Sequence, residues 1–177
     1  MATRNGTGGE AGQAELIGYQ AAISLWAHER GVCWNRFNVM LLVNAIVMAV
    51  LAATFANDSS AQVPALILCV IGLALSATWL ALTRRSFEVQ NYYLKSAQEI
   101  EEGSLGGAVR TLARGEAFGQ GEKVTLTLDG DDETMQLGGL AGVVTAEMGA
   151  QVLIGIFGGL YVLLAILTVV QMGRQMF

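Results

Sequence analysis

Residues 37–83, FNVMLLVNAIVMAVLAATFANDSSAQVPALILCVIGLALSATWLALT, decide the fold, because they hold two long runs without any charged side chain. These runs cover residues 37–57 and 61–83, and a third of the same kind, AQVLIGIFGGLYVLLAILTVVQM, covers 150–172. A bilayer core about 30 Å thick is crossed by roughly 20 helical residues. Within hydrocarbon the backbone must satisfy its own hydrogen bonds, so each run predicts a transmembrane helix.

The composition of the whole chain agrees with a membrane protein. Of its 177 residues, 53% are hydrophobic and 14% are charged, whereas a soluble domain has about 25% charged residues. This apolar content excludes a disordered chain, and two cysteines exclude a disulfide scaffold. The predicted fold class is an all-α membrane protein, with a two-span hairpin at 37–83, a third span at 150–172, cytoplasmic helical extensions and a small β-hairpin.

Basic residues predict the orientation of the three spans. Three Lys or Arg residues precede the first span, none lies in the link at 58–60, and six lie between the second and third spans. The positive-inside rule therefore places the N-terminus and the segment 84–149 in the cytoplasm, and the tail 173–177 outside. Tryptophans favour the headgroup layer, so they join the arginines as expected topology anchors, namely Arg36, Arg84, Arg85, Trp34 and Trp79.

The region before the first span divides into two parts. Residues 1–14 are small and polar, and we expect them to be disordered. Residues 15–36 carry apolar side chains at three- and four-residue steps, which predicts an amphipathic helix that leads into the first span.

The segment 84–149 is expected to begin as a helical extension of the second span that ends near Gly103, with its acidic end far from the membrane. A short helix is expected around residues 107–114. Residues 122–128 alternate strictly, and 134–137 are expected to pair with them across the sequence AspGlyAspAspGlu.

Small residues recur at four-residue spacing in the spans. Gly155 and Gly159 form a GxxxG pattern, which gives a flat surface that another helix can approach closely. Asn44, inside the first span, either lines a pore or, as we favour, forms an interhelical hydrogen bond. The expected positions of helix packing and oligomerisation are Gly155, Gly158, Gly159, Gly72, Ser76, Ala45, Ala49 and Asn44.

Other polar residues give little sign of chemistry. Glu147 either contributes to an acidic ring at a pore mouth or, as we favour, is a solvated residue at the membrane surface. The spans contain no Asp, Glu, Lys, Arg or His, which argues against a proton pump, a proton-coupled transporter or an intramembrane catalyst.

The remaining motifs argue against an enzyme. The acidic run at 129–133 lacks the spacing of an EF-hand, so we interpret it as a solvated turn. A single histidine excludes most catalytic triads, and one His with one nearby Cys does not complete a zinc site. The segment 84–149 has six bases and eleven acids, which disfavours nucleic acid. We expect no catalytic activity, metal, cofactor or nucleic-acid partner.

The order of short motifs resembles a known family. These motifs are TrpAsnArgPheAsn (34–38) at the entry of the hairpin, Trp79 near its end, ArgArg (84–85), and TyrTyrLeuLysSerAlaGlnGluIleGlu (92–101). This order resembles the small bacterial RipA-like octameric membrane proteins and, more distantly, the two-span SLATT effector domains of bacterial conflict systems. The similarity covers roughly residues 15–102. The third, glycine-rich span and the expected lack of a sensor or nuclease domain are departures from it.

The resemblance implies a homo-oligomer of a bacterial inner membrane, with a cytoplasmic part and eight subunits. The more distant resemblance to SLATT domains implies a role in pore formation. Our leading hypothesis is therefore a non-enzymatic homo-oligomer, in contact with membrane lipids, that acts as a channel-like or scaffolding ring. The alternative is an accessory subunit of a larger membrane transporter or enzyme complex.

Overall fold

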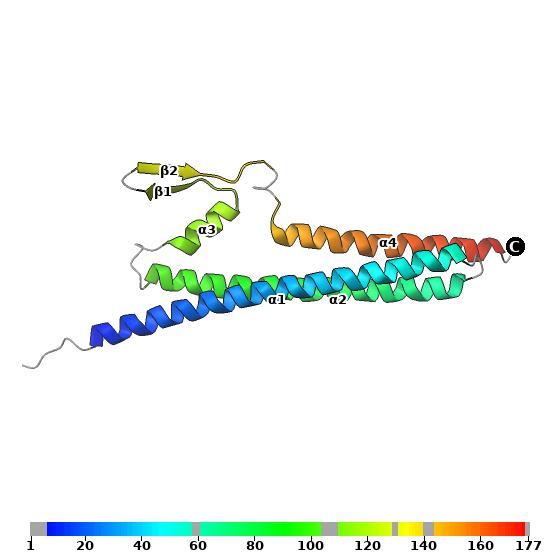
Figure 1. Ribbon diagram of the computed structural model, residues 1–177, viewed down its shortest axis with the longest axis horizontal. Coiled ribbons are helices and arrows are strands. Elements are labelled where there is room, and N and C mark those ends of the chain that lie inside the picture. Colours follow the sequence, from blue (N-terminus) through cyan, green and yellow to red (C-terminus); the bar gives the residue numbers. More distant parts are fainter. Residues whose placement is uncertain (1–6, 58–60, 104–109, 129–130, 140–143, 176–177) are drawn as a thin grey trace, which may run out of the picture. The chain divides into compact units, whose positions relative to one another are not determined.

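The computed structural model describes residues 7–57, 61–103, 110–128, 131–139 and 144–175, in two compact units. The first unit comprises residues 1–31 and 87–146, and the second comprises 32–86 and 147–177. The order of elements is α1 (Thr7–Asn57), α2 (Gln62–Gly103), α3 (Thr111–Gly119), β1 (Val124–Leu128), β2 (Asp131–Met135) and α4 (Ala146–Gln175) (Figure 1).

Among the described residues, three helices are long and apolar enough to cross a membrane: α1, α2 and α4. Most side chains in their apolar segments are exposed on the surface of the single chain. A soluble protein would bury such surfaces, whereas here they are suited to lipid or to other subunits. The structure thus confirms an all-α membrane protein with one small hairpin.

The ends of the helices differ from the predicted ones. Helix α1 begins at Thr7, so the prediction of disorder was wrong for residues 7–14, whereas residues 1–6 lie outside the described part. Residues 7–14 extend a helix that is already nucleated further along the chain, so they avoid the costly nucleation step and add one hydrogen bond for each residue fixed. Helix α4 continues to Gln175, so most of the predicted tail is helical, and residues 176–177 are not described.

Helix α3 lies further along the chain than expected. It spans Thr111–Gly119 instead of 107–114, and residues 104–109 lie outside the described part. A residue from another helix contacts the first turn of α3, as shown below, and this tertiary contact is invisible to a local pattern.

The hairpin register also differs from the prediction. Val124 pairs with Met135 and Leu128 with Asp131, so only residues 129–130, which are not described, separate the strands. The second strand therefore begins three residues earlier than predicted, and residues 131–133 of the acidic run belong to a strand. A two-residue Asp-Gly link explains the shift, since loop length sets the register of a hairpin. Every residue of β2 is exposed to solvent.

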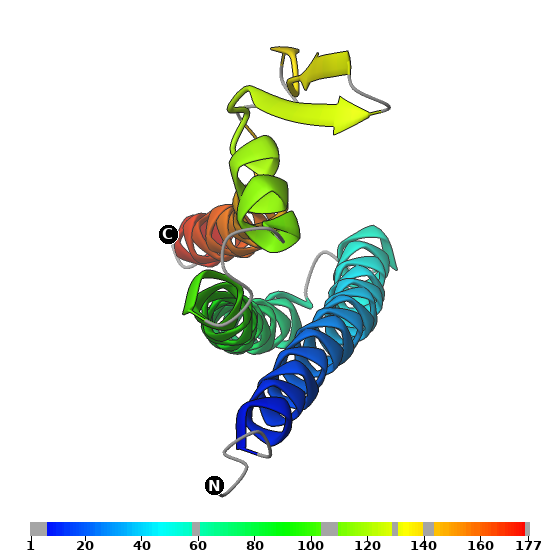
Figure 2. The same cartoon turned by 90° about the vertical axis from the view of Figure 1, so that its left-hand side faces the viewer.

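In the first unit, α3 lies between the C-terminal part of α2 and the two strands, as the side and end views both show (Figure 2). Val124 of β1 is buried. A hydrophobic cavity of about 270 Å³ lies between α3 and the hairpin, lined by residues that include Phe118, Leu126 and Met135. Because an isolated hairpin is marginal in water, this packing supports it.

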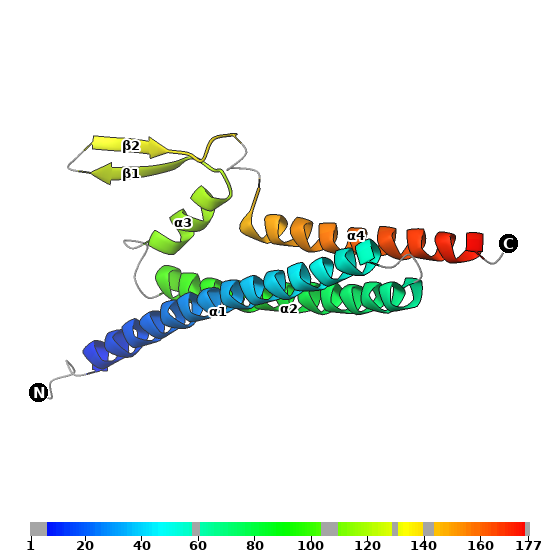
Figure 3. The ribbon, with the colours of Figure 1, turned by 45° about the vertical axis from the view of Figure 1, so that its right-hand side comes forward.

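In the second unit, the parts of α1, α2 and α4 that belong to it run side by side (Figure 3). Their buried centre consists of one cluster to which each helix contributes, namely Leu51, Ala65, Cys69 and Tyr161.

Aromatic rings extend this core. The ring of Trp79 lies 4.9 Å from that of Phe37 and 6.1 Å from that of Phe157, measured between centroids, and Trp79 is only 1% exposed. The prediction of Trp79 as a headgroup anchor was therefore wrong. Its position near the end of a span does not reveal which face of the helix it occupies. The other expected anchors, Trp34, Arg36, Arg84 and Arg85, are exposed.

Candidate functional site

A polar cluster joins the three helices inside the second unit. Asn44 of α1 is completely buried, and its side-chain amide donates to the carbonyl oxygen of Met40 at 2.9 Å. The hydroxyl of Tyr161 on α4 lies 3.2 Å from the backbone oxygen of Asn44 and 3.4 Å from its Oδ1. Ser76 of α2 donates to the same Oδ1 at 3.5 Å. The amide thus lies within the packed helices of a single chain.

Next to this cluster, Gly72 of α2 allows the ring of Tyr161 to approach the helix backbone. A Cβ atom at position 72 would overlap Cε1, Cζ and Cδ1 of Tyr161. One turn along, the Cβ of Ser76 lies 3.9 Å from the position that a Cβ on Gly158 would occupy. Gly72, Ser76 and Gly158 therefore pack α2 against α4 inside the chain.

The other small residues face outward. A Cβ added at Gly155 or Gly159 would meet no atom of the described residues within 4 Å. Ala45 and Ala49 of α1 are exposed as well. We call Gly155 with Gly159 the α4 stripe, and Ala45 with Ala49 the α1 stripe. Packing among the residues that the structure describes does not use either stripe.

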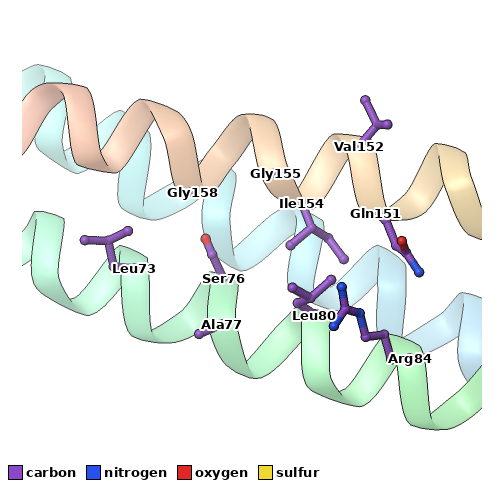
Figure 4. Close-up of a pocket in the computed structure, with 10 residues that line it drawn as sticks. All are labelled: Leu73, Ser76, Ala77, Leu80, Arg84, Gln151, Val152, Ile154, Gly155 and Gly158. Atoms are coloured by element: carbon purple, nitrogen blue, oxygen red, sulfur yellow. The ribbon is translucent and has the colours of Figure 1, made fainter.

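A groove of about 460 Å³ lies between α2 and α4 in the second unit (Figure 4). Apolar side chains line most of it, among them Leu73, Leu80 and Ile154, and Gly155 lines it as well. Arg84 and Gln151 lie at the same end of the groove, on opposite helices.

Glu147 lies one turn before Gln151, in the first turn of α4. It is partly buried, and its carboxylate accepts a hydrogen bond of 3.0 Å from Nε2 of Gln151. The positive end of a helix dipole favours a carboxylate in this position.

The first unit contains a buried carboxylate at the acidic end of α2. Glu101 of α2 is 1% exposed, and its Oε1 accepts hydrogen bonds from the hydroxyl of Tyr19 at 2.7 Å and the backbone N–H of Leu112 at 3.1 Å. Its Oε2 accepts a longer bond, of 3.4 Å, from the N–H of Ala113. One side chain of α2 thus caps the first turn of α3 and binds α1.

A signal for this buried position was present in the sequence. Glu101 follows Ala97 by four residues and Leu94 by seven, so it lies on the same face of the helix as these two apolar residues. Its neighbour Glu102 lies off this face and is exposed. The approach of Tyr19 and of α3, which makes burial of a carboxylate favourable, comes only from the tertiary structure.

The hydrogen bond from Tyr19 predicts a pH dependence. Burial, followed by the hydrogen bond to Glu101 and its charge, raises the pKa of Tyr19 from 10.0 to about 12. Since the folded pKa is the higher one, the contribution of this contact to stability is complete below pH 10.0 and is lost as the pH rises through about 12. In a titration followed by phenolate absorbance, Tyr19→Phe should remove a step near pH 12.

The matched control is Tyr92→Phe, because Tyr92 belongs to the same unit and is exposed. If the step near pH 12 persisted in Tyr19→Phe, the ionisation would belong to another group and the assignment would be wrong.

Within the described residues, no group of three or more His, Cys, Asp or Glu side chains is arranged to hold a metal ion. The two cysteines, Cys33 and Cys69, are both buried and are not joined by a disulfide.

The family model described as "Octameric membrane protein family (8xMP)" matches residues 17–170. The chain belongs to the octameric membrane protein family. No curated protein and no solved structure gave a match. The matched range includes α4, so the third span that the sequence analysis treated as a departure lies within the 8xMP family pattern. Family membership and the apolar helices make this chain a self-associating membrane protein.

Proposed function

We propose that this 8xMP protein forms a ring of eight subunits in a bacterial cytoplasmic membrane and acts there as a channel-like or scaffolding assembly, with no chemistry of its own. The observation that carries the proposal is the pair of stripes left outside the packing of the single chain. Small residues on a lipid-facing helix allow another helix to approach closely, which is the main source of association energy in a bilayer.

The positions of the stripes suit a ring. A closed ring of more than two subunits pairs two different surfaces at each contact, because each subunit meets its neighbours head to tail. The α4 stripe and the α1 stripe lie on different helices, as such a contact needs. We propose that the α4 stripe of one subunit packs against the α1 stripe of the next.

We further propose that the N-terminus and the segment 84–149 face the cytoplasm. Exposed Arg36, Arg84 and Arg85 at the ends of their spans support this orientation through the positive-inside rule. Glu147 then lies near the cytoplasmic entrance of the ring.

The test of the ring is the mass of the purified particle, measured by light scattering or native mass spectrometry. The wild type should give eight times the mass of the 18.7 kDa chain. The double variant Gly155→Leu/Gly159→Leu should give smaller particles, because two leucine side chains would prevent close approach at the α4 stripe.

The control is Gly149→Leu, which adds the same side chain to α4 at another open position outside the stripe. It should leave the mass unchanged. An unchanged mass in the double variant would refute the role of the α4 stripe. A monomeric wild type that co-purifies with a different membrane protein would refute the ring and support the accessory-subunit alternative. For an intact ring, ion flux in liposomes distinguishes a channel from a scaffold.

A further inference from the structure

The groove between α2 and α4 has the chemistry of a lipid site. Its walls are apolar along most of its length, with Leu73, Leu80 and Ile154 among the lining residues, and it is open on the surface of the chain (Figure 4). Its volume of about 460 Å³ lies in the range of pockets that hold small molecules, roughly 300–1,000 Å³. The medium around a transmembrane helix supplies acyl chains to such a groove.

One end of the groove is cationic. Arg84, the first residue after the predicted second span, lines this end, and its side chain makes no hydrogen bond or ion pair with any residue that the structure describes. Across from it, Gln151 extends from α4 toward α2 (Figure 4). The guanidinium group binds phosphate in bidentate geometry, and charge-assisted hydrogen bonds of this kind are strong.

We propose that this groove binds a glycerophospholipid, with an acyl chain along Leu73, Leu80 and Ile154 and the phosphate on Arg84. The alternative occupant is a helix of a neighbouring subunit. The neighbouring helix that the proposed ring brings to α4 is α1, and residues 30–57 of α1 contain no acidic residue. That helix therefore brings no anion to Arg84, whereas every phospholipid of the leaflet does. The charge of Arg84 therefore favours the lipid.

Glu147 restricts which lipid headgroups the proposed site can bind. Its carboxylate is bonded to Gln151, at the same end of the groove. A headgroup with further negative charge would be repelled there, whereas the ammonium group of phosphatidylethanolamine is attracted. Phosphatidylethanolamine is therefore the probe.

The experiment is native mass spectrometry of the intact oligomer in detergent, titrated with phosphatidylethanolamine, with bound lipids counted per chain. Arg84→Gln should weaken binding about tenfold, because hydrogen bonds to a charged group are lost. Arg85→Gln is the matched control, since Arg85 is also exposed and follows directly but does not line the groove. It removes the same charge, so it also controls for an effect on membrane orientation.

A second pair of variants tests the apolar wall. Ala77 lines the groove, and Ala74 is exposed on the same helix outside it. Ala77→Phe should fill the groove and abolish tight binding, whereas Ala74→Phe should bind as the wild type does. Equal losses in Arg84→Gln and Arg85→Gln, or wild-type binding by Ala77→Phe, would overturn the proposal. The oligomer mass is recorded in the same spectra, so loss of a lipid is distinguished from loss of the assembly.

Discussion

Gly72→Ala is expected to destabilise the second unit by about 3 kcal/mol, the upper part of the usual range for overpacking a buried site. The added methyl group would overlap the ring of Tyr161, which is completely buried and is not a flexible chain end. Displacing the ring would also break the hydrogen bonds from its hydroxyl to Asn44, and lipid offers no replacement. Thermal unfolding in detergent, followed by circular dichroism, measures the effect.

Gly149→Ala is the control for Gly72→Ala, since it adds the same methyl group to open space on α4 outside the α4 stripe. It should melt no lower than the wild type. The double variant Gly72→Ala/Tyr161→Leu should lose less stability than the two single variants lose together, because a smaller side chain makes room for the methyl group. If Gly72→Ala melted like Gly149→Ala, the close approach of the ring would not determine stability.

Glu101→Ala is expected to release α3 from the first unit. The change leaves the hydroxyl of Tyr19 and the N–H groups of Leu112 and Ala113 without their acceptor. Loss of hydrogen bonds to a buried charge costs about 3 kcal/mol. Hydrogen exchange at the Leu112 amide should therefore become faster by about a hundredfold.

The control for this change is Glu102→Ala, which removes a carboxylate from the adjacent, exposed position. It should leave exchange at Leu112 unchanged. Similar exchange rates at the Leu112 amide in both variants would show that Glu101 does not hold α3 in place.

Several features were accessible from sequence because they depend on local composition. The three spans follow from runs of uncharged residues long enough to cross a bilayer, and no tertiary contact is needed to recognise them. The family resemblance rested on motifs within residues 15–102, and the family match extends it to 17–170. The hairpin was found by strict alternation, but its register was wrong because five residues were assigned to the link instead of two.

Local composition did not reveal which face of each helix lies in the core. A transmembrane helix is apolar all round, so its sequence carries no polar stripe that distinguishes the core side from the outer side. For this reason Trp79 was assigned to the headgroup layer although it lies in the core. For the same reason Gly72, which contacts Tyr161, and Gly155, where an added Cβ would meet nothing in the described chain, appeared equivalent.

The sequence by itself therefore determined that this is a three-span membrane protein, because solvation by lipid is a property of each segment alone. Only the tertiary structure decided which small residues pack within the chain and which remain outside, and that Glu101 binds two other helices. Those outcomes depend on how distant segments approach one another. A close contact or a buried carboxylate is stable only where a partner from another helix has been brought to it.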